Sequence, residues 1–186
     1  MKDLKLFMIL LGATPKGRNI EQHDMFFGIA ASVKDLLPEM KAFWPEANDK
    51  IHIDAYRIVN KVGAYKVEVI AKANEVKKDL TSLFFLNLGG YKQGEFEELH
   101  YKMLVVANQK AQAIKEAKET AFYKHTGFKG ATSHIDDKFG VDVDDVFEIV
   151  DILSVETKNQ YALKFSLADG LPDDELVLGY IPLSKL

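Results

Sequence analysis

Pairs of a histidine and an acidic residue, two positions apart, occur four times in the sequence. The pairs are Glu21 with His23, His52 with Asp54, Glu98 with His100, and His134 with Asp136. Imidazoles and carboxylates together can bind Zn²⁺, Mn²⁺ or Fe²⁺, or exchange protons as acid and base in a ligand pocket. They can also form hydrogen-bonded pairs that only stabilise the fold. The sequence leaves these three hypotheses open.

The elements predicted to position these pairs are β-strands. His23 opens the aromatic and branched run "HDMFFGIA", and His52 opens "HIDAYRIV", and such residues are common in strands. Side chains two apart on a strand point to the same face, about 7 Å apart along the chain. If the two strands are neighbours, the four side chains of the first two pairs converge. Core-type residues such as Ile51 and Ile53 flank them, so we expect a mostly buried polar cluster.

An internal duplication explains why the pairs recur. An offset of 77 residues places "LFMILLG" (Leu6–Gly12) on "LFFLNLG" (Leu83–Gly89), and one Glu-x-His pair on the other. An offset of 82 places one His-x-Asp pair on the other. The change of offset predicts a five-residue insertion in the second copy, between Ala107 and His134. Matches in the same order at nearly constant spacing indicate two copies of one unit.

The predicted fold class is α+β, with each copy a β-β-α-β-β unit in a mostly antiparallel sheet whose helices pack on one side. The predicted segments are residues 5–70 for copy one, 71–81 for a linker, 82–153 for copy two and 154–186 for a C-terminal strand extension. Within the extension, "QYALKFSLA" and "ELVLGYIPL" predict a β-hairpin around residues 169–174. Each copy alone is too small to bury much core, so we expect one compact pseudo-symmetric unit.

The apolar runs Leu6–Leu11 and Leu83–Leu88 predict central strands that are buried on both faces. The first run follows two lysines and in that respect resembles a short signal peptide. Its twin in mid-chain favours a core strand instead, because cleavage would remove from copy one a strand that copy two keeps. A cytoplasmic location is therefore expected, in agreement with the absence of cysteine.

The composition excludes several classes of function. A net charge of −4 without a lysine- or arginine-rich block argues against nucleic-acid binding. No apolar run approaches the length that spans a bilayer, so no membrane partner is expected. The absence of cysteine excludes disulfides, thiolate nucleophiles, zinc–thiolate sites and iron–sulfur clusters.

Familiar cofactor and catalytic motifs are also absent. The glycines of "GATPKG" and "GGYKQG" are not followed by the lysine and hydroxyl residue of a phosphate-binding loop. The acidic stretch "DDKFGVDVDD" has its glycine at the fifth position, whereas a calcium loop needs it at the sixth. No Gly-x-Ser-x-Gly of a serine hydrolase occurs. We therefore predict no cofactor, apart from the divalent metal of the metal hypothesis.

The stretches "KLFMILLGATPKGRNIEQHDMFF" and "FWPEANDKIHIDAYR", with the second set of "LGG", "ELH" and "HIDD", resemble the family known as domain of unknown function 1543. The resemblance spans residues 5–153 and repeats within the chain. It implies a bacterial protein without an established activity. No catalytic residue can be carried over from it.

These observations support three functional hypotheses. The first is a binding or interaction module for a protein or small-molecule partner, without catalysis. The second is a metal-dependent enzyme, of hydrolase or oxygenase type, that uses the Glu-x-His and His-x-Asp pairs. The third is a structural oligomer, such as a homodimer, in which exposed C-terminal strands pair between subunits.

Overall fold

The structure is a computed structural model that describes residues 3–75, 80–91, 96–126, 142–168 and 170–186. Its fold is α+β, as predicted, and every strand pair among the described residues is antiparallel. The chain divides into two compact units, which are Met1–Glu75 with Leu153–Leu186 (the first unit) and Val76–Ile152 (the second unit). No helix in the described ranges is both long enough and apolar enough to cross a membrane.

The first unit contains two sheets and several short helices. Its strands are β1 (Lys5–Ala13), β2 (Gln22–Ala30), β3 (His52–Ile58), β4 (Lys61–Val62), β5 (Tyr65–Ala71), β9 (Tyr161–Leu167) and β10 (Val177–Pro182). Its helices are η1 (Val33–Leu36), α1 (Leu37–Phe43), η2 (Pro45–Lys50), η3 (Lys72–Asn74), α4 (Val155–Gln160) and η4 (Leu183–Lys185).

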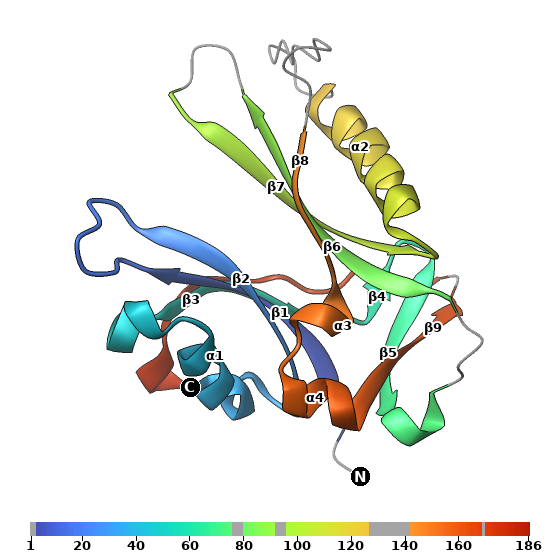
Figure 1. Cartoon of the computed structure of the whole chain (residues 1–186), viewed down its shortest axis with the longest axis horizontal. Coiled ribbons are helices and arrows are strands. Elements are labelled where there is room, and N and C mark those ends of the chain that lie inside the picture. The colour runs from blue at the N-terminus through green and yellow to red at the C-terminus, as the bar shows by residue number, and fades with distance from the viewer. Residues whose placement is uncertain (1–2, 76–79, 92–95, 127–141, 169) are drawn as a thin grey trace. The chain divides into compact units, whose positions relative to one another are not determined.

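A four-stranded sheet in the order β10-β3-β1-β2 carries the core of the first unit. Alternate residues of β1, namely Phe7, Ile9 and Leu11, pack with the buried Leu36 and Met40 of η1 and α1. Figure 1 shows α1 beside this sheet. Full burial of each such side chain contributes about 1.5–3 kcal/mol. The alternation turns the intervening residues of β1, Gly12 among them, to its other face.

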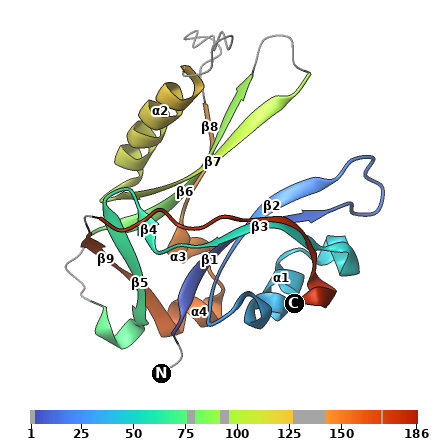
Figure 2. The ribbon, with the colours of Figure 1, turned by 180° about the vertical axis from the view of Figure 1, so that it is seen from behind.

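The two C-terminal strands both form, but they do not pair with each other. β9 adds to β5 in a three-stranded sheet of order β4-β5-β9, whereas β10 pairs with β3. Figure 2 shows β10 running beside β3 and β9 beside β5. The predicted hairpin is therefore replaced by two separate additions. The physical reason is that β3 and β5 lie in different sheets, and each has an edge whose backbone groups need a partner.

The second unit is one sheet with a helix on it. Its elements are β6 (Ser82–Tyr91), β7 (Glu98–Ala107), α2 (Lys110–Thr126), β8 (Asp142–Glu148) and α3 (Ile149–Ile152). The strand order is β7-β6-β8, and Figure 1 shows α2 lying along the sheet. Its core contains Leu86 and Leu88 of β6, packed with Ala113 and Ala117 of α2. The small alanines let the helix approach the sheet closely.

The prediction that Leu6–Leu11 and Leu83–Leu88 form central strands is confirmed. β1 lies between β3 and β2, and β6 lies between β7 and β8. Ile9, Leu11 and Leu86 are fully buried. A nearly continuous apolar run suits a strand that has neighbours on both edges and little contact with water.

The segment that ends the second unit departs from the prediction. The β-β-α-β-β order predicts a strand at "VFEIVDIL", but β8 ends at Glu148 and the short helix α3 follows, burying Ile149. The other predicted strand, "SHIDDKFGV", lies in residues 133–141, outside the described part of the chain. Among the described residues, β6 pairs with β7 on one side and with β8 on the other.

Candidate metal centre

Strands β2 and β3 position the histidine–acid pairs of the first unit, and Gly12 of β1 lies between them. Gly12 is opposite His23 on one side and opposite His52 on the other. Strands β2 and β3 are therefore not neighbours. From the sequence, the four side chains were predicted to converge only if these two strands were neighbours. Directly opposed residues of antiparallel strands point to the same face. Both imidazoles thus lie on the face of β1 that is turned away from α1.

A β-bulge places Asp54. Leu10 of β1 is opposite Ala55 and Leu11 is opposite Ile53, so Asp54 has no partner on β1. Strand β10 is also irregular here, because its register shifts between Leu178 and Ile181. A bulge adds one unpaired residue and re-aims its side chain. The carboxylate of Asp54 therefore reaches the same point as the imidazoles.

The four side chains meet in one cluster, which consists of Glu21, His23, His52 and Asp54. His52 Nε2 lies 3.0 Å from Glu21 Oε1 and 3.3 Å from Asp54 Oδ1. His23 Nε2 lies 3.2 Å from Asp54 Oδ2 and 3.6 Å from Glu21 Oε2. Each carboxylate thus turns one oxygen toward His52 and the other toward His23. His52 and His23 therefore contact different oxygens of the same two carboxylates.

Gly12 is the residue that makes room for this cluster. A Cβ atom at position 12 would overlap Asp54 Oδ2 and would lie 2.5 Å from His52 Nε2. Any other residue at this position would therefore force the carboxylate and the imidazole apart. The sequence contains a signal for this role, since Gly12 and Gly89 end the two matching apolar runs.

The orientation of His52 is set by the backbone. His52 Nδ1 lies 3.3 Å from the carbonyl oxygen of Lys50, so a proton on Nδ1 can be donated to that carbonyl. Nε2 then carries a lone pair that faces two carboxylates. Although both carboxylate oxygens are close, His52 Nε2 has no aligned hydrogen-bond partner, and neither has the buried Asp54 Oδ2. With a proton on Nδ1, His52 Nε2 and the two carboxylate oxygens beside it are all acceptor atoms.

The cluster is buried on one side and open on the other. The side chain of His52 is 5% exposed, whereas those of Glu21 and His23 are 44% and 42% exposed. The expectation of a mostly buried cluster therefore holds for His52 and not for the pair on β2. The reason is position, since Glu21 precedes the first residue of β2 and His23 is the second residue of that edge strand. Solvent and small solutes can reach the cluster from this side.

Tyr180 of β10 covers the buried imidazole of His52, although the tyrosine itself is 68% exposed. Its ring lies on the imidazole of His52, with centroids 4.3 Å apart and planes at 39°. Gly179, with φ of 131°, directly precedes it at the irregularity in β10. No pattern in the sequence marks Tyr180, because its place beside His52 depends on the pairing of β10 with β3.

The second unit repeats the backbone register around Gly89. Gly89 is opposite His100 of β7 and opposite Asp142 of β8. The register with β8 also shifts at the same place, between Asn87 and Leu88. The position that corresponds to His52 is therefore occupied by an aspartate.

This register corrects the alignment made from the sequence. The offset of 82 matched His134 with His52, whereas the residue opposite Gly89 is Asp142. His134 and Asp136 lie outside the described residues. Glu98 and His100 are both exposed on β7. The structure thus brings together the four candidate residues of the first unit. Of the four candidate residues of the second unit, it describes Glu98 and His100.

Comparisons with known proteins agree with the family resemblance and the fold. Residues 18–69 match the family model described as Domain of Unknown Function (DUF1543), which confirms the resemblance for a segment that includes the whole cluster. The crystal structure of a protein Il1583 from Idiomarina loihiensis is similar, with a TM-score of 0.62 and 22% identity over 97% of this chain and 98% of that chain. At this identity the likeness shows the fold. No curated protein matches the chain.

Proposed function

We propose that the first unit is a binding module for a divalent transition-metal cation, held by Glu21, His52 and Asp54. One donor atom from each of these three residues lies within 4.8 Å of the other two. The observation that carries the proposal is the buried His52 Nε2, which has two carboxylate oxygens close by and no aligned hydrogen bond. Two carboxylates that face the same imidazole nitrogen repel each other unless a positive charge lies between them. A cation at the common point supplies that charge.

The distances fit shared coordination. Donor atoms about 2.0–2.2 Å from one cation lie about 2.8–3.6 Å from each other in octahedral to tetrahedral geometry. The distances of 3.0 Å and 3.3 Å from His52 Nε2 to the two carboxylate oxygens fall within this range. The contact of Nδ1 with the Lys50 carbonyl is the usual outer contact of a metal-binding histidine, because it fixes the proton on the far nitrogen.

The donor set also narrows the choice of cation. One imidazole and two carboxylates suit Zn²⁺, Mn²⁺ or Fe²⁺, whereas Mg²⁺ and Ca²⁺ prefer oxygen ligands alone. Three protein ligands with an open side leave a coordination position for water or a small ligand. The proposed site is therefore open, so its cation and the ligands of that cation can exchange with solvent, unlike those of a closed structural site.

The first prediction is that cation-free protein, purified without a histidine tag, binds one Zn²⁺ or Mn²⁺ per chain. At a free concentration of about 100 times Kd the cation should stabilise the fold by about 2.7 kcal/mol, which raises Tm by roughly 5–10 °C. The affinity should fall as the pH is lowered, because protons compete for the imidazole and the carboxylates. Calorimetric titration and thermal melts measure both effects. Sub-stoichiometric binding with an unchanged Tm would contradict the proposal.

A second candidate function, metal-dependent hydrolysis, is favoured by the position of His23. This imidazole touches the carboxylate oxygens that face away from His52, and it is close to half exposed. A base in such a place can take a proton from a cation-bound water that enters from the open side. His23 would then act on the reacting water, while the other three residues hold the cation.

The second prediction separates this function from simple binding. His23→Gln should lower cation affinity by about tenfold, the lower end of what the loss of an outer contact costs, because the change removes no ligand. If the module is hydrolytic, the same change should lower metal-dependent cleavage of p-nitrophenyl acetate by at least about 100-fold. Initial rates with and without EDTA provide the measurement. Equal rates for metal-loaded and metal-free wild type would reject the hydrolytic function and leave the binding function in place.

A further inference from the structure

The cluster contains more donor atoms than the proposed cation uses. That cation takes His52 Nε2 and one oxygen each of Glu21 and Asp54. The other oxygens of the two carboxylates lie beside His23 Nε2, at 3.6 Å for Glu21 Oε2 and 3.2 Å for Asp54 Oδ2. His23 does not belong to the set of groups whose donor atoms all lie within 4.8 Å of one another. The first cation therefore leaves an imidazole and two carboxylate oxygens unused.

Asp54 Oδ2 is a buried atom among these unused donors. It has no aligned hydrogen bond, although His23 Nε2 is only 3.2 Å away. A buried acceptor without a partner is unfavourable, because it has lost its contact with water and gained nothing in return. This oxygen is not one of the atoms on which the first cation depends. It therefore points independently to a missing positive group on the side of His23.

We propose that His23, Glu21 and Asp54 hold a second divalent transition-metal cation, so that both carboxylates bridge two cations. This inference rests on the proposed function, since the first cation uses the other oxygens of the same carboxylates. Each cation then has one imidazole and two carboxylate oxygens, a set that suits Zn²⁺ or Mn²⁺. The distances of 3.2 Å and 3.6 Å from His23 Nε2 fit the separation of about 2.8–3.6 Å between donors of one cation. Paired cations in proteins are about 3.5–4 Å apart.

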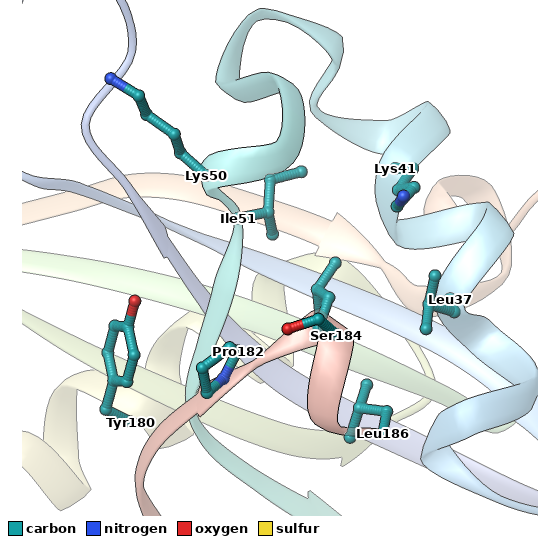
Figure 3. A pocket seen from close by; sticks show the side chains of 9 residues that line it. Leu37, Lys41, Lys50, Ile51, Tyr180, Pro182, Ser184 and Leu186 are labelled. Atoms are coloured by element: carbon teal, nitrogen blue, oxygen red, sulfur yellow. The ribbon is translucent and has the colours of Figure 1, made fainter.

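The second cation lies on the open side of the cluster. The side chain of His23 is 42% exposed, whereas Tyr180 packs on the imidazole of His52. Figure 3 shows Tyr180 beside the strand that begins after Ile51. The second cation is thus the more exposed of the two, and the first cation repels it. In this two-cation form His23 is a ligand, so it can act as a base only in the one-cation form.

The test is a titration of cation-free whole protein, purified without a histidine tag, with Mn²⁺ followed by EPR. We expect two steps of one Mn²⁺ per chain, the first being the cation of the proposed function. The second should be at least about tenfold weaker, because like charges repel. The bridged ions should couple magnetically and give a hyperfine pattern that the one-cation form lacks. His23→Gln should lose the second step and the coupled pattern, and its remaining first step shows that the variant is folded.

His100→Gln is the matched control, because His100 is opposite Gly89 as His23 is opposite Gly12. This variant should keep both steps. A single step in the wild type would overturn the inference and leave the proposed function in place. The inference also fails if His23→Gln keeps the second step, if His100→Gln loses it, or if two bound Mn²⁺ ions show no coupling. Absence of both steps would reject the proposed function and this inference together.

Discussion

Gly12→Ala should abolish cation binding while leaving the fold intact. The added methyl group would overlap Asp54 Oδ2 and lie 2.5 Å from His52 Nε2, so the carboxylate and the imidazole must separate. We expect Zn²⁺ affinity to fall by at least about 100-fold, the upper end of what the loss of an outer-shell contact costs. Alanine is tolerated in a strand as well as glycine is, so Tm of the cation-free protein should change little. Calorimetric titration and melting curves of both proteins provide the comparison.

The matched control is Gly17→Ala. Gly17 has φ of 85° and no atom within 4 Å of an added Cβ. Alanine there is strained and should cost about 1–2 kcal/mol of stability, but it touches no residue of the cluster. Gly12→Ala should thus lose affinity for Zn²⁺ and keep its stability, whereas Gly17→Ala should lose stability and keep its affinity for Zn²⁺. A Gly12→Ala protein that binds Zn²⁺ like wild type would show that the cation lies elsewhere.

Asp54→Asn separates a metal centre from a purely structural cluster. The amide keeps the shape of the side chain and removes one of the two negative charges that face His52. For a metal centre we expect cation affinity to fall by at least about 100-fold. Tm of the cation-free protein should stay the same or rise, because the repulsion between the carboxylates of Glu21 and Asp54 is relieved. A structural ion pair would behave oppositely, since its loss costs about 1–3 kcal/mol.

Asp24→Asn is the control for this change. Asp24 is opposite Leu11, so it is on the other face of β2 from His23 and outside the cluster. Its substitution should alter neither cation affinity nor, beyond about 0.5 kcal/mol, stability. A lower Tm of Asp54→Asn in EDTA, together with unchanged affinity for Zn²⁺ and Mn²⁺, would refute the metal centre and restore the structural hypothesis.

The sequence by itself determined the strands and the chemistry they carry. The apolar runs of β1 and β6 predicted central strands, because a strand buried on both faces needs apolar residues throughout. Period-two spacing predicted a common strand face for Glu21 with His23, and for His52 with Asp54. The residue types limited the chemistry to cation binding, proton exchange or hydrogen bonding. All of these conclusions depend on local patterns, which adjacent residues define.

Only the tertiary structure decided how those strands meet. That Gly12 separates β2 from β3, and that its missing side chain lets the four groups touch, follows from strand order, which no local pattern encodes. The bulge at Asp54 and the pairing of β10 with β3 likewise depend on residues far apart in the sequence. In the second unit, motif identity pointed to His134, yet the residue opposite Gly89 is Asp142. The hydrophobic pattern and the turn geometry set the register of a strand, so a motif that occurs twice does not by itself decide which residues pair.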